Sequence, residues 1–251
     1  MLRKARHYHD EERIGELEEL ILPYLQADYH QVSGFNHPTL LIYTQDQPTL
    51  PMPATWGLVP SWVKSEEQKK QIWNKTLNAR GETIFEKAAF KSSARNKRCV
   101  LHIDGFYEHF HKQGKTYPYY IAPANKSTLG VAALSATWFD AAANQEISTF
   151  SIVTTKGNRL MSGIHNNPQL SEARMPAFLL AGQEDLWLKS MTDPTSTAEI
   201  LEQIKPYPND ALVAHTVRKI RGKNSLYNDP RAAEPYEYLE LSEQDDQYSL
   251  F

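Results

Sequence analysis

Three short segments of this sequence carry polar side chains of the kinds that hold phosphate groups and transfer protons. The first, residues 77–83, contains Asn78 and Arg80; the second, residues 104–108, ends in Glu108; the third has His165, with Arg174 shortly after it. Together they supply an amide, a carboxylate, an imidazole and two guanidinium groups. Such a set can bind an aldehyde or a phosphate and move protons at it. The combination and its order carry more information than any one segment.

Glu108 lies among aromatic residues. In an extended strand, Phe106, Glu108 and Phe110 share one face because side chains alternate with a period of two. The carboxylate is therefore either exposed on an edge strand or held beside the aromatic rings as a general acid or base. Both interpretations fit the sequence.

Asn78, Arg80 and His165 each have a structural and a chemical interpretation. Asn78 precedes residues 82–90, which we expect to be helical, so its amide either caps that helix or orients a reacting group. Arg80 either pairs with an acid such as Glu82 or presents its planar fork to a phosphate. His165 lies at a turn and is either structural or catalytic.

Two tryptophans flank a turn at Gly57 and Pro60. Trp56 lies inside an expected strand and is assigned to the core. Trp62 follows Pro60 and is expected to be a surface platform on which a nucleobase stacks.

Neither the cysteine nor the histidine pairs point to a metal site. Cys99 lies in an apolar strand and is expected to be a packing residue. The pairs His7/His9 and His109/His111 have no cysteine or acidic partner at metal-ligand spacing, so we expect no metal.

The composition describes one globular domain. The chain has 251 residues, of which 41% are hydrophobic and 23% charged, with a net charge of −3. No apolar run approaches the roughly 18 residues of a membrane span, and no secretory signal follows Met1. One cysteine cannot form an internal disulfide, and with no secretory signal we expect a cytoplasmic protein. Because no long apolar run is present, we also expect no membrane contact. The net charge argues against indiscriminate polyanion binding but allows a local basic groove.

Charge is unevenly distributed along the chain. Residues 234–251 hold six acidic residues and no Lys or Arg, which predicts a solvated acidic tail after a single domain at residues 1–233. Residues 87–98 are basic and form either a solvated helix face or a ligand site. No heptad or apolar seam appears, so we expect a monomer.

The hydrophobic pattern predicts an α+β domain that is rich in strands. We expect a bent, barrel-like, mainly antiparallel sheet with peripheral helices, because many strands follow one another with short connections. The expected strands are residues 29–33, 39–44, 55–59, 98–103, 106–111, 117–121, 129–138, 149–155, 177–180 and 212–220. The expected helices are residues 10–23, 64–74, 82–90, 183–191 and 198–204.

In this combination and order, the sequence resembles the SOS-response-associated peptidase (SRAP) family of abasic-site-processing proteins. The similarity runs from about residue 29 to about residue 220. It is carried by Trp56-Gly57-Leu58-Val59-Pro60-Ser61-Trp62, Asn78-Ala79-Arg80, Asp104-Gly105-Phe106-Tyr107-Glu108, Ile164-His165, Arg174-Met175-Pro176 and His215. The resemblance implies a groove for single-stranded DNA, covalent capture of the abasic-site aldehyde, removal of the initiator methionine, and no cofactor.

The resemblance also implies roles for single residues. Asn78 would orient the N-terminal residue, Glu108 would relay protons to and from the attacking amine, and His165 would assist opening of the sugar ring. For the DNA strand, Arg80 and Arg174 would hold phosphates and Trp62 would stack near the lesion. The expected partner is single-stranded DNA with an abasic site.

The sequence departs from the family at its start and in one insertion. In the family the attacking amine belongs to a cysteine at position two, whereas this sequence begins Met1-Leu2. Cys99 matches an interior strand position and does not replace that cysteine. We expect either that the sequence starts a few residues late or that the protein binds single-stranded DNA non-covalently; a self-processing peptidase is a third interpretation. Residues 166–173 form an insertion before Arg174.

Overall fold

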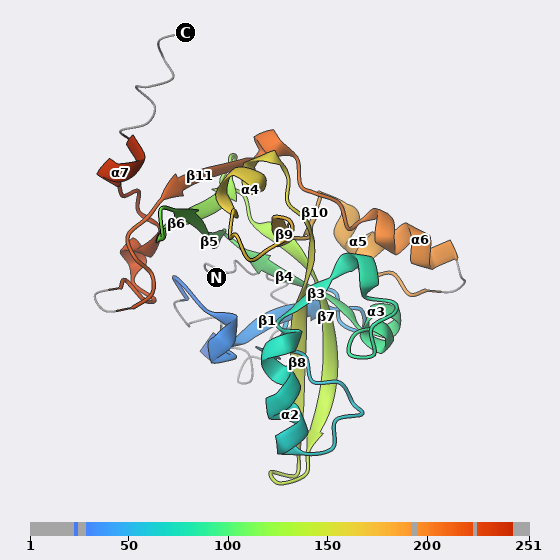
Figure 1. Cartoon of the computed structure of the whole chain (residues 1–251). Coiled ribbons are helices and arrows are strands. Elements are labelled where there is room, and N and C mark those ends of the chain that lie inside the picture. The colour runs from blue at the N-terminus through green and yellow to red at the C-terminus, as the bar shows by residue number, and fades with distance from the viewer. Residues whose placement is uncertain (1–22, 25–28, 192–194, 223–224, 243–251) are drawn as a thin grey trace.

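Five strands close into a barrel in this computed structural model, which describes residues 23–24, 29–191, 195–222 and 225–242 (Figure 1). In barrel order the strands are β7 (Leu129–Asp140), β4 (Arg98–Ile103), β1 (Thr39–Thr44), β2 (Met52–Trp56) and β8 (Gln145–Lys156). The β7–β8 pairing closes the ring, and the β2–β8 pairing is parallel while the others are antiparallel. Closure removes the unpaired sheet edges that an open sheet of this size would expose.

The far end of β8 extends the sheet and gathers segments that are distant in sequence. Short strand β3 (Asn78–Arg80) pairs with β8 in parallel, and β9 (Arg174–Pro176) pairs with it antiparallel. Thr154 of β8 is the partner of Arg80 on one side and of Pro176 on the other. This arrangement places β3 and β9 on either side of one strand, which is what brings their polar side chains together.

A second, three-stranded sheet follows directly from the barrel. It consists of β5 (Phe106–Lys112), β6 (Lys115–Pro123) and β11 (Leu212–Thr216), all antiparallel. The chain passes from β4 to β5 at Gly105, where an added Cβ would lie 2.5 Å from the Tyr120 hydroxyl and 2.6 Å from the Ile121 carbonyl oxygen. Only glycine allows this close approach of the two sheets.

The core has two layers because the barrel strands are buried on both faces. Inside the barrel, Ile42, Leu101, Val131 and Phe150 belong to one apolar cluster. The outward-facing residues of the same strands form a second cluster under the helices. This double burial explains why residues 131–134 are a continuous apolar run rather than an alternating one.

Helices cover the outside of the barrel and connect the strands. Helices α3 (Lys91–Asn96), α5 (Gln183–Leu188) and α6 (Thr195–Glu202) supply Ala94, Trp187 and Ile200 to the outer cluster. Helix α2 (Glu66–Ile72) begins after Ser65, whose hydroxyl accepts a hydrogen bond from the Gln68 N–H. The remaining elements are α4 (Arg159–Ile164), α7 (Leu239–Ser242), β10 (Phe178–Leu179) and the 3-10 turns η1 (Gly34–Asn36), η2 (Trp73–Thr76), η3 (Gly81–Thr83), η4 (Asn209–Ala211) and η5 (Pro230–Ala233). Within the described residues, no helix has the length and apolar character that crossing a membrane requires.

The predicted fold class is confirmed, and strands 39–44 and 98–103 have the predicted bounds. Two element predictions are wrong. Residues 29–33 hold one bridge residue rather than a strand, since the N–H groups of His30 and Gln31 donate to the Asn228 side chain. Residues 82–90 are turns rather than a helix, and helix begins only at Lys91. The helix predicted for residues 10–23 lies almost wholly outside the described residues.

The acidic segment is only partly what the sequence suggested. Residues 234–242 pack against the second sheet: the Tyr236 N–H donates to the Thr216 carbonyl, and the Tyr238 ring meets Tyr117 edge-on at 5.0 Å. Glu240 pairs with Lys115 at 3.0 Å. The half-buried Tyr236 and Tyr238 thus anchor this stretch, while its acidic residues Glu234, Glu237 and Glu240 are exposed.

Candidate active site

Glu108 and His165 face each other across two elements. Glu108 lies in the middle of β5, and His165 is the residue at which α4 ends. The His165 Nε2 atom is 3.8 Å from Oε2 of Glu108, and the two side chains are 17% and 29% exposed. The pair is close enough to share a proton after a small movement, and it is open enough to reach a bound molecule.

The backbone of β9 sets the orientation of the His165 ring. Its Nδ1 atom lies 2.9 Å from the Arg174 carbonyl oxygen and 3.4 Å from the Arg174 backbone nitrogen. We assign the shorter contact as Nδ1–H donating to the carbonyl. With Nδ1 held by the backbone, Nε2 is the ring nitrogen that faces Glu108, so a proton can pass between Nε2 and the carboxylate. This is the arrangement of a general acid and base acting together.

A small cavity gathers residues from all three of the segments that the sequence singled out. Its volume is about 170 Å³, and Asn78, Glu108, His165 and Arg174 all line it. Trp56, Phe106, Tyr107, Ile152, Thr154, Met175 and Pro176 complete the wall. Asn78 lies on strand β3 and caps no helix, which excludes the capping interpretation.

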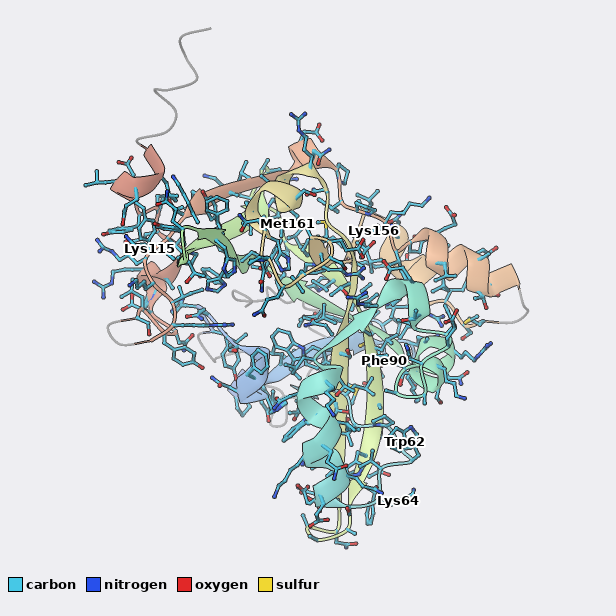
Figure 2. The ribbon with its side chains drawn as sticks, viewed as in Figure 1. Trp62, Lys64, Phe90, Lys115, Lys156 and Met161 are labelled. Atoms are coloured by element: carbon cyan, nitrogen blue, oxygen red, sulfur yellow. The ribbon has the colours of Figure 1, made fainter. Side chains whose placement is uncertain are left out.

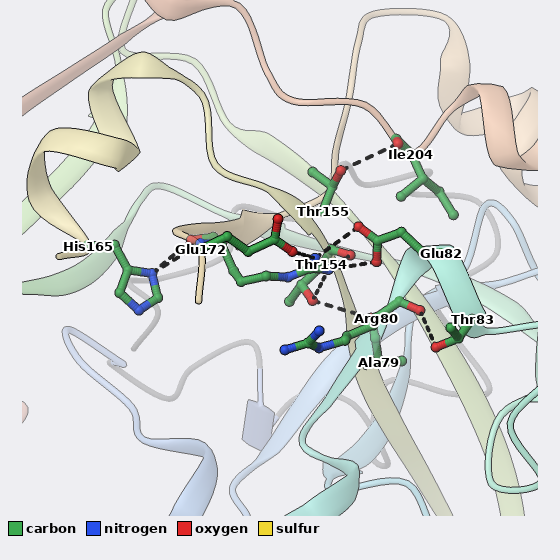
Figure 3. Close-up of polar contacts among 10 residues, drawn as sticks. Ala79, Arg80, Glu82, Thr83, Thr154, Thr155, His165, Glu172 and Ile204 are labelled. Atoms are coloured by element: carbon green, nitrogen blue, oxygen red, sulfur yellow. Dashed lines mark hydrogen bonds and ion pairs between the residues drawn. The ribbon is translucent and has the colours of Figure 1, made fainter. Parts of the chain in front are cut away.

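Arg174 is engaged by other protein groups. Its Nη1 and Nη2 atoms each donate to a different oxygen of Glu82 at 2.9 Å, and Nη1 also reaches Glu172 at 3.1 Å (Figure 3). Nη2 donates in addition to the Thr154 carbonyl at 2.8 Å. The terminal N–H groups are therefore committed, and the side chain is only 11% exposed. The hydrogen bonds from Arg174 lower the pKa of Glu82. Phosphate binding by Arg174 stays a prediction.

Arg80 has no such partner. It lies two residues beyond Asn78 on β3 and is exposed like Asn78, so both side chains leave the same face of the strand. Glu82, the acid suggested as its partner, pairs with Arg174 instead. No hydrogen bond or ion pair engages the Arg80 guanidinium within the described part of the chain, and Figure 3 shows it extending away from Glu82, toward the side on which His165 lies.

Trp62 and His215 lie outside the cavity. Trp62 is 50% exposed and its indole N–H points to the Ala88 carbonyl at 3.4 Å. In Figure 2 it lies near Lys64 in the lower half of the molecule, while Met161 of α4 lies in the upper half. Trp56 is buried, which confirms its assignment to the core. His215 bonds the Ala233 carbonyl through Nε2 at 2.9 Å and is structural.

A second and larger cavity shares part of its wall with the first. Its volume is about 540 Å³, and Tyr107, Glu108 and His165 line both cavities. The sequence motifs did not identify the other residues of its wall, which are His109, His111, Thr116, Pro118, Asn167, Lys219, Ile220 and Arg221. The alternation of Tyr107, His109 and His111 along β5 was the available signal, because it places them on one strand face. Lys219 and Arg221 had no signal, since only the tertiary fold brings them near β5.

His109 is the group in this cavity whose ionisation is clearly perturbed. Burial lowers the pKa of His109 to about 4, and the positive charge of Arg221 acts in the same direction. His109 is therefore neutral at pH 7, and its ring can accept or donate a hydrogen bond without adding charge.

Cys99 and Arg98, the last residue of the basic segment, have structural roles. Cys99 is fully buried in β4, which confirms it as a packing residue, and burial raises the pKa of its thiol. In the basic segment, Arg98 is buried and donates to the carbonyls of Trp187, Ala94 and Arg95. Across residues 23–24, 29–191, 195–222 and 225–242, no three His, Cys, Asp or Glu side chains are placed to hold a metal ion.

Comparison with known proteins gives a consistent set of matches. Residues 11–223 match the family model described as SOS response associated peptidase (SRAP). The chain is 35% identical over 182 residues to "Abasic site processing protein YoqW" of Bacillus subtilis, covering 72% of each protein. It is 32% identical over 208 residues to "Abasic site processing protein HMCES" of Gallus gallus, covering 74% of this chain and 57% of that protein.

The fold is also found among solved structures. A crystal structure of a protein from Bacteroides thetaiotaomicron superposes with a TM-score of 0.78 at 31% sequence identity, covering 90% of this chain and 94% of that one. A structure from Bordetella bronchiseptica, 24% identical, gives a TM-score of 0.64 over 85% of this chain, which is a likeness of fold alone.

Proposed function

Because this chain belongs to the SOS response associated peptidase (SRAP) family, we propose that it processes abasic sites in single-stranded DNA. The observation that carries the proposal is the Glu108–His165 pair, 3.8 Å apart at the wall of a cavity of about 170 Å³. That volume is below the range of about 300–1,000 Å³ that is usual for drug-sized ligands. A deoxyribose that has lost its base suits such a space better than a complete nucleotide.

The pair supplies the proton transfers that this chemistry needs. As the sugar ring opens, His165 donates a proton from Nε2 to the ring oxygen while Glu108 accepts the proton of the C1 hydroxyl, which leaves the aldehyde, and Glu108 returns its proton to Nε2. When the amine attacks, His165 protonates the aldehyde oxygen, and Glu108 accepts the amine proton and passes it to the hydroxyl that leaves as water. The amine nitrogen bonds to the aldehyde carbon, and loss of one water molecule leaves a Schiff base. Asn78, which lines the same cavity, would hold a sugar hydroxyl or the incoming amine.

Arg80 is the best candidate for a phosphate contact on this side of the site. Its guanidinium is free of hydrogen bonds from the described residues, and it shares a strand face with Asn78. A planar fork with free N–H groups matches a phosphate oxygen pair. Arg174 fixes β9, and its backbone carbonyl orients His165. A phosphate contact by Arg174 is part of the proposal as well. Trp62 is proposed to stack on a nucleobase farther along the DNA strand.

One observation favours a second candidate function, non-covalent recognition of single-stranded DNA. The single cysteine of the sequence, Cys99, is fully buried, and burial raises the pKa of its thiol. It therefore cannot supply the thiol that closes a stable ring on a Schiff base. An amine without a neighbouring thiol gives at most a reversible adduct.

A denaturing gel with single-stranded DNA bearing one abasic site tests the proposal and separates the two candidates. The protein is used in its Met1-Leu2 form and in a variant that places a cysteine directly after the initiator methionine, each with and without borohydride to reduce a Schiff base. A band that needs borohydride supports reversible capture, and a band without reductant from the cysteine variant supports durable capture. DNA retained in a native gel without a covalent band supports the binding module. The absence of DNA affinity at low salt would count against both.

A further inference from the structure

The larger cavity adjoins the site at which we place the abasic sugar, and the inference drawn from it rests on the proposed function. Tyr107, Glu108 and His165 belong to the walls of both cavities, so the reacting pair lies at their junction. With about 540 Å³, the second cavity falls within the usual range for ligands of nucleotide size, which the smaller one does not.

Two cations are presented at this cavity by a firmly anchored segment. Val217 and Ile220 are buried, and the Val217 N–H donates to the Pro118 carbonyl at 3.0 Å. The Lys219 carbonyl accepts from the Leu226 N–H, also at 3.0 Å. Because these anchors fix the backbone, the exposed side chains of Lys219 and Arg221 reach the cavity from a defined position.

Within the part of the chain that the structure describes, these two cations differ from neighbouring cations in having no ion-pair or ring partner. Lys115 pairs with Glu240, and Arg218 lies over the Tyr236 ring at 4.5 Å. By contrast, neither Lys219 nor Arg221 takes part in an ion pair within the described residues. Glu108 is the single acidic residue among the described residues of the cavity wall.

The cavity is therefore suited to an anion. Burial lowers the pKa of His109, and the charge of Arg221 adds to this effect, which is consistent with a positive local potential. Among the described residues these two cations have no acidic partner, and they lie beside the proposed sugar site, so they define a place for phosphate.

We propose that this cavity binds the nucleotide next to the abasic sugar, and that Lys219 and Arg221 hold its phosphate. The strand then crosses the site in one direction, from Arg80, past the Glu108–His165 pair, to Lys219 and Arg221. The apolar surfaces of Pro118 and Ile220 and the neutral His109 ring face the sugar or base of that nucleotide.

The experiment measures binding of the full chain to fluorescent single-stranded oligonucleotides that contain tetrahydrofuran, an abasic analogue without an aldehyde. Three oligonucleotides are used, with the analogue inside the strand, at the 5′ end or at the 3′ end. The two oligonucleotides with a terminal analogue, called the end forms, are each made with and without a terminal phosphate. The variant is Lys219→Ala with Arg221→Ala. A matched control removes the same charge elsewhere through Lys205→Ala with Arg231→Ala, whose side chains pair with Glu202 and Asp229.

We expect the variant to bind the internal analogue about tenfold more weakly than wild type, with the control near wild type. The slope of log affinity against log salt should fall by about 0.7 for each phosphate group that the variant no longer neutralises. With one of the two end forms the variant and wild type should bind alike, because that oligonucleotide has no nucleotide to place in the cavity.

Three results would overturn the inference. The first is that variant and control bind the oligonucleotides with equal affinity. The second is that the variant loses the same affinity wherever the analogue stands. The third is that the variant loses affinity only for oligonucleotides with a terminal phosphate, which would assign the cavity to strand ends. Wild-type protein that binds none of the oligonucleotides would refute the proposed function itself, so the two failures are distinguishable.

Discussion

The side-chain amide of Asn166 hydrogen-bonds to both backbone polar groups of His111. Its Oδ1 accepts from the His111 N–H at 2.6 Å, and its Nδ2 donates to the His111 carbonyl at 2.8 Å. The amide thus makes the pair of hydrogen bonds that the backbone of a neighbouring strand would make with the end of β5. Because Asn166 follows His165 directly and β5 carries Glu108, this contact ties together the two segments that hold Glu108 and His165.

Replacing Asn166 by alanine should slow the reaction more than it destabilises the fold. Two exposed hydrogen bonds are worth about 1–2 kcal/mol of unfolding free energy. Loss of the tie should let His165 and Glu108 separate, and we expect borohydride-trapped adduct to form about tenfold more slowly. Urea denaturation and trapping kinetics measure the two effects. Asn96→Ala, which removes an amide bonded only to the Ser92 carbonyl, is the control. Equal trapping rates for Asn166→Ala and Asn96→Ala would contradict the idea.

Glu108 and His165 should behave as one unit when mutated. Glu108→Gln and His165→Gln each keep the size of the side chain but remove a proton carrier, so trapping should slow by a factor of about 10²–10⁴. The double variant should be no slower than the worse single variant, because both changes interrupt the same transfer. Binding of the tetrahydrofuran analogue should stay within about threefold of wild type. Additive losses would mean that the two residues act in separate steps.

Glu82 should contribute stability through Arg174. Glu82→Gln should lower the unfolding free energy by about 1 kcal/mol at pH 7, a value discounted because the Glu82 side chain is 43% exposed. The pKa of Glu82 is lowered in the folded state, so its contribution is present above its ordinary pKa of 4.5 and is lost as pH falls through the folded value. Urea midpoints at pH 7 and pH 3 measure the difference, which should shrink at the lower pH. Glu172→Gln, which removes the 3.1 Å contact to Nη1, should cost less.

The barrel was predictable because its strands show clear hydrophobic patterns. Residues 98–103 and 129–138 are examples, in which apolar side chains either run continuously or alternate with polar ones. Residues 82–90 misled because turns bury Ile84 and Phe90 much as a helix would, so the apolar pattern did not distinguish the two. The meeting of Asn78, Glu108 and His165 was anticipated from their resemblance to a family and their order, since spacing alone left each one ambiguous.

Other features of the site depend on contacts that no local pattern encodes. The pairing of Arg174 with Glu82 joins residues 92 positions apart, and it left Arg80 as the free guanidinium among the described residues of the site. Lys219 and Arg221 reach β5 only because Val217 and Ile220 anchor their segment in the second sheet. In sequence they look like any charged pair near the end of a domain.

The neutral state of His109 should make the folded protein sensitive to mild acid. The folded pKa of His109 is about 4, below the ordinary value of 6.5, so the unfolded chain binds more protons between these values. Stability should therefore be complete above pH 6.5 and fall as pH drops toward 4, by on the order of 2 kcal/mol from this residue. His109→Gln should flatten that part of the profile, whereas His111→Gln should keep it. Urea denaturation from about pH 4.5 to about pH 7.5 measures the slopes, and an unchanged slope in His109→Gln would show that the acid sensitivity arises elsewhere.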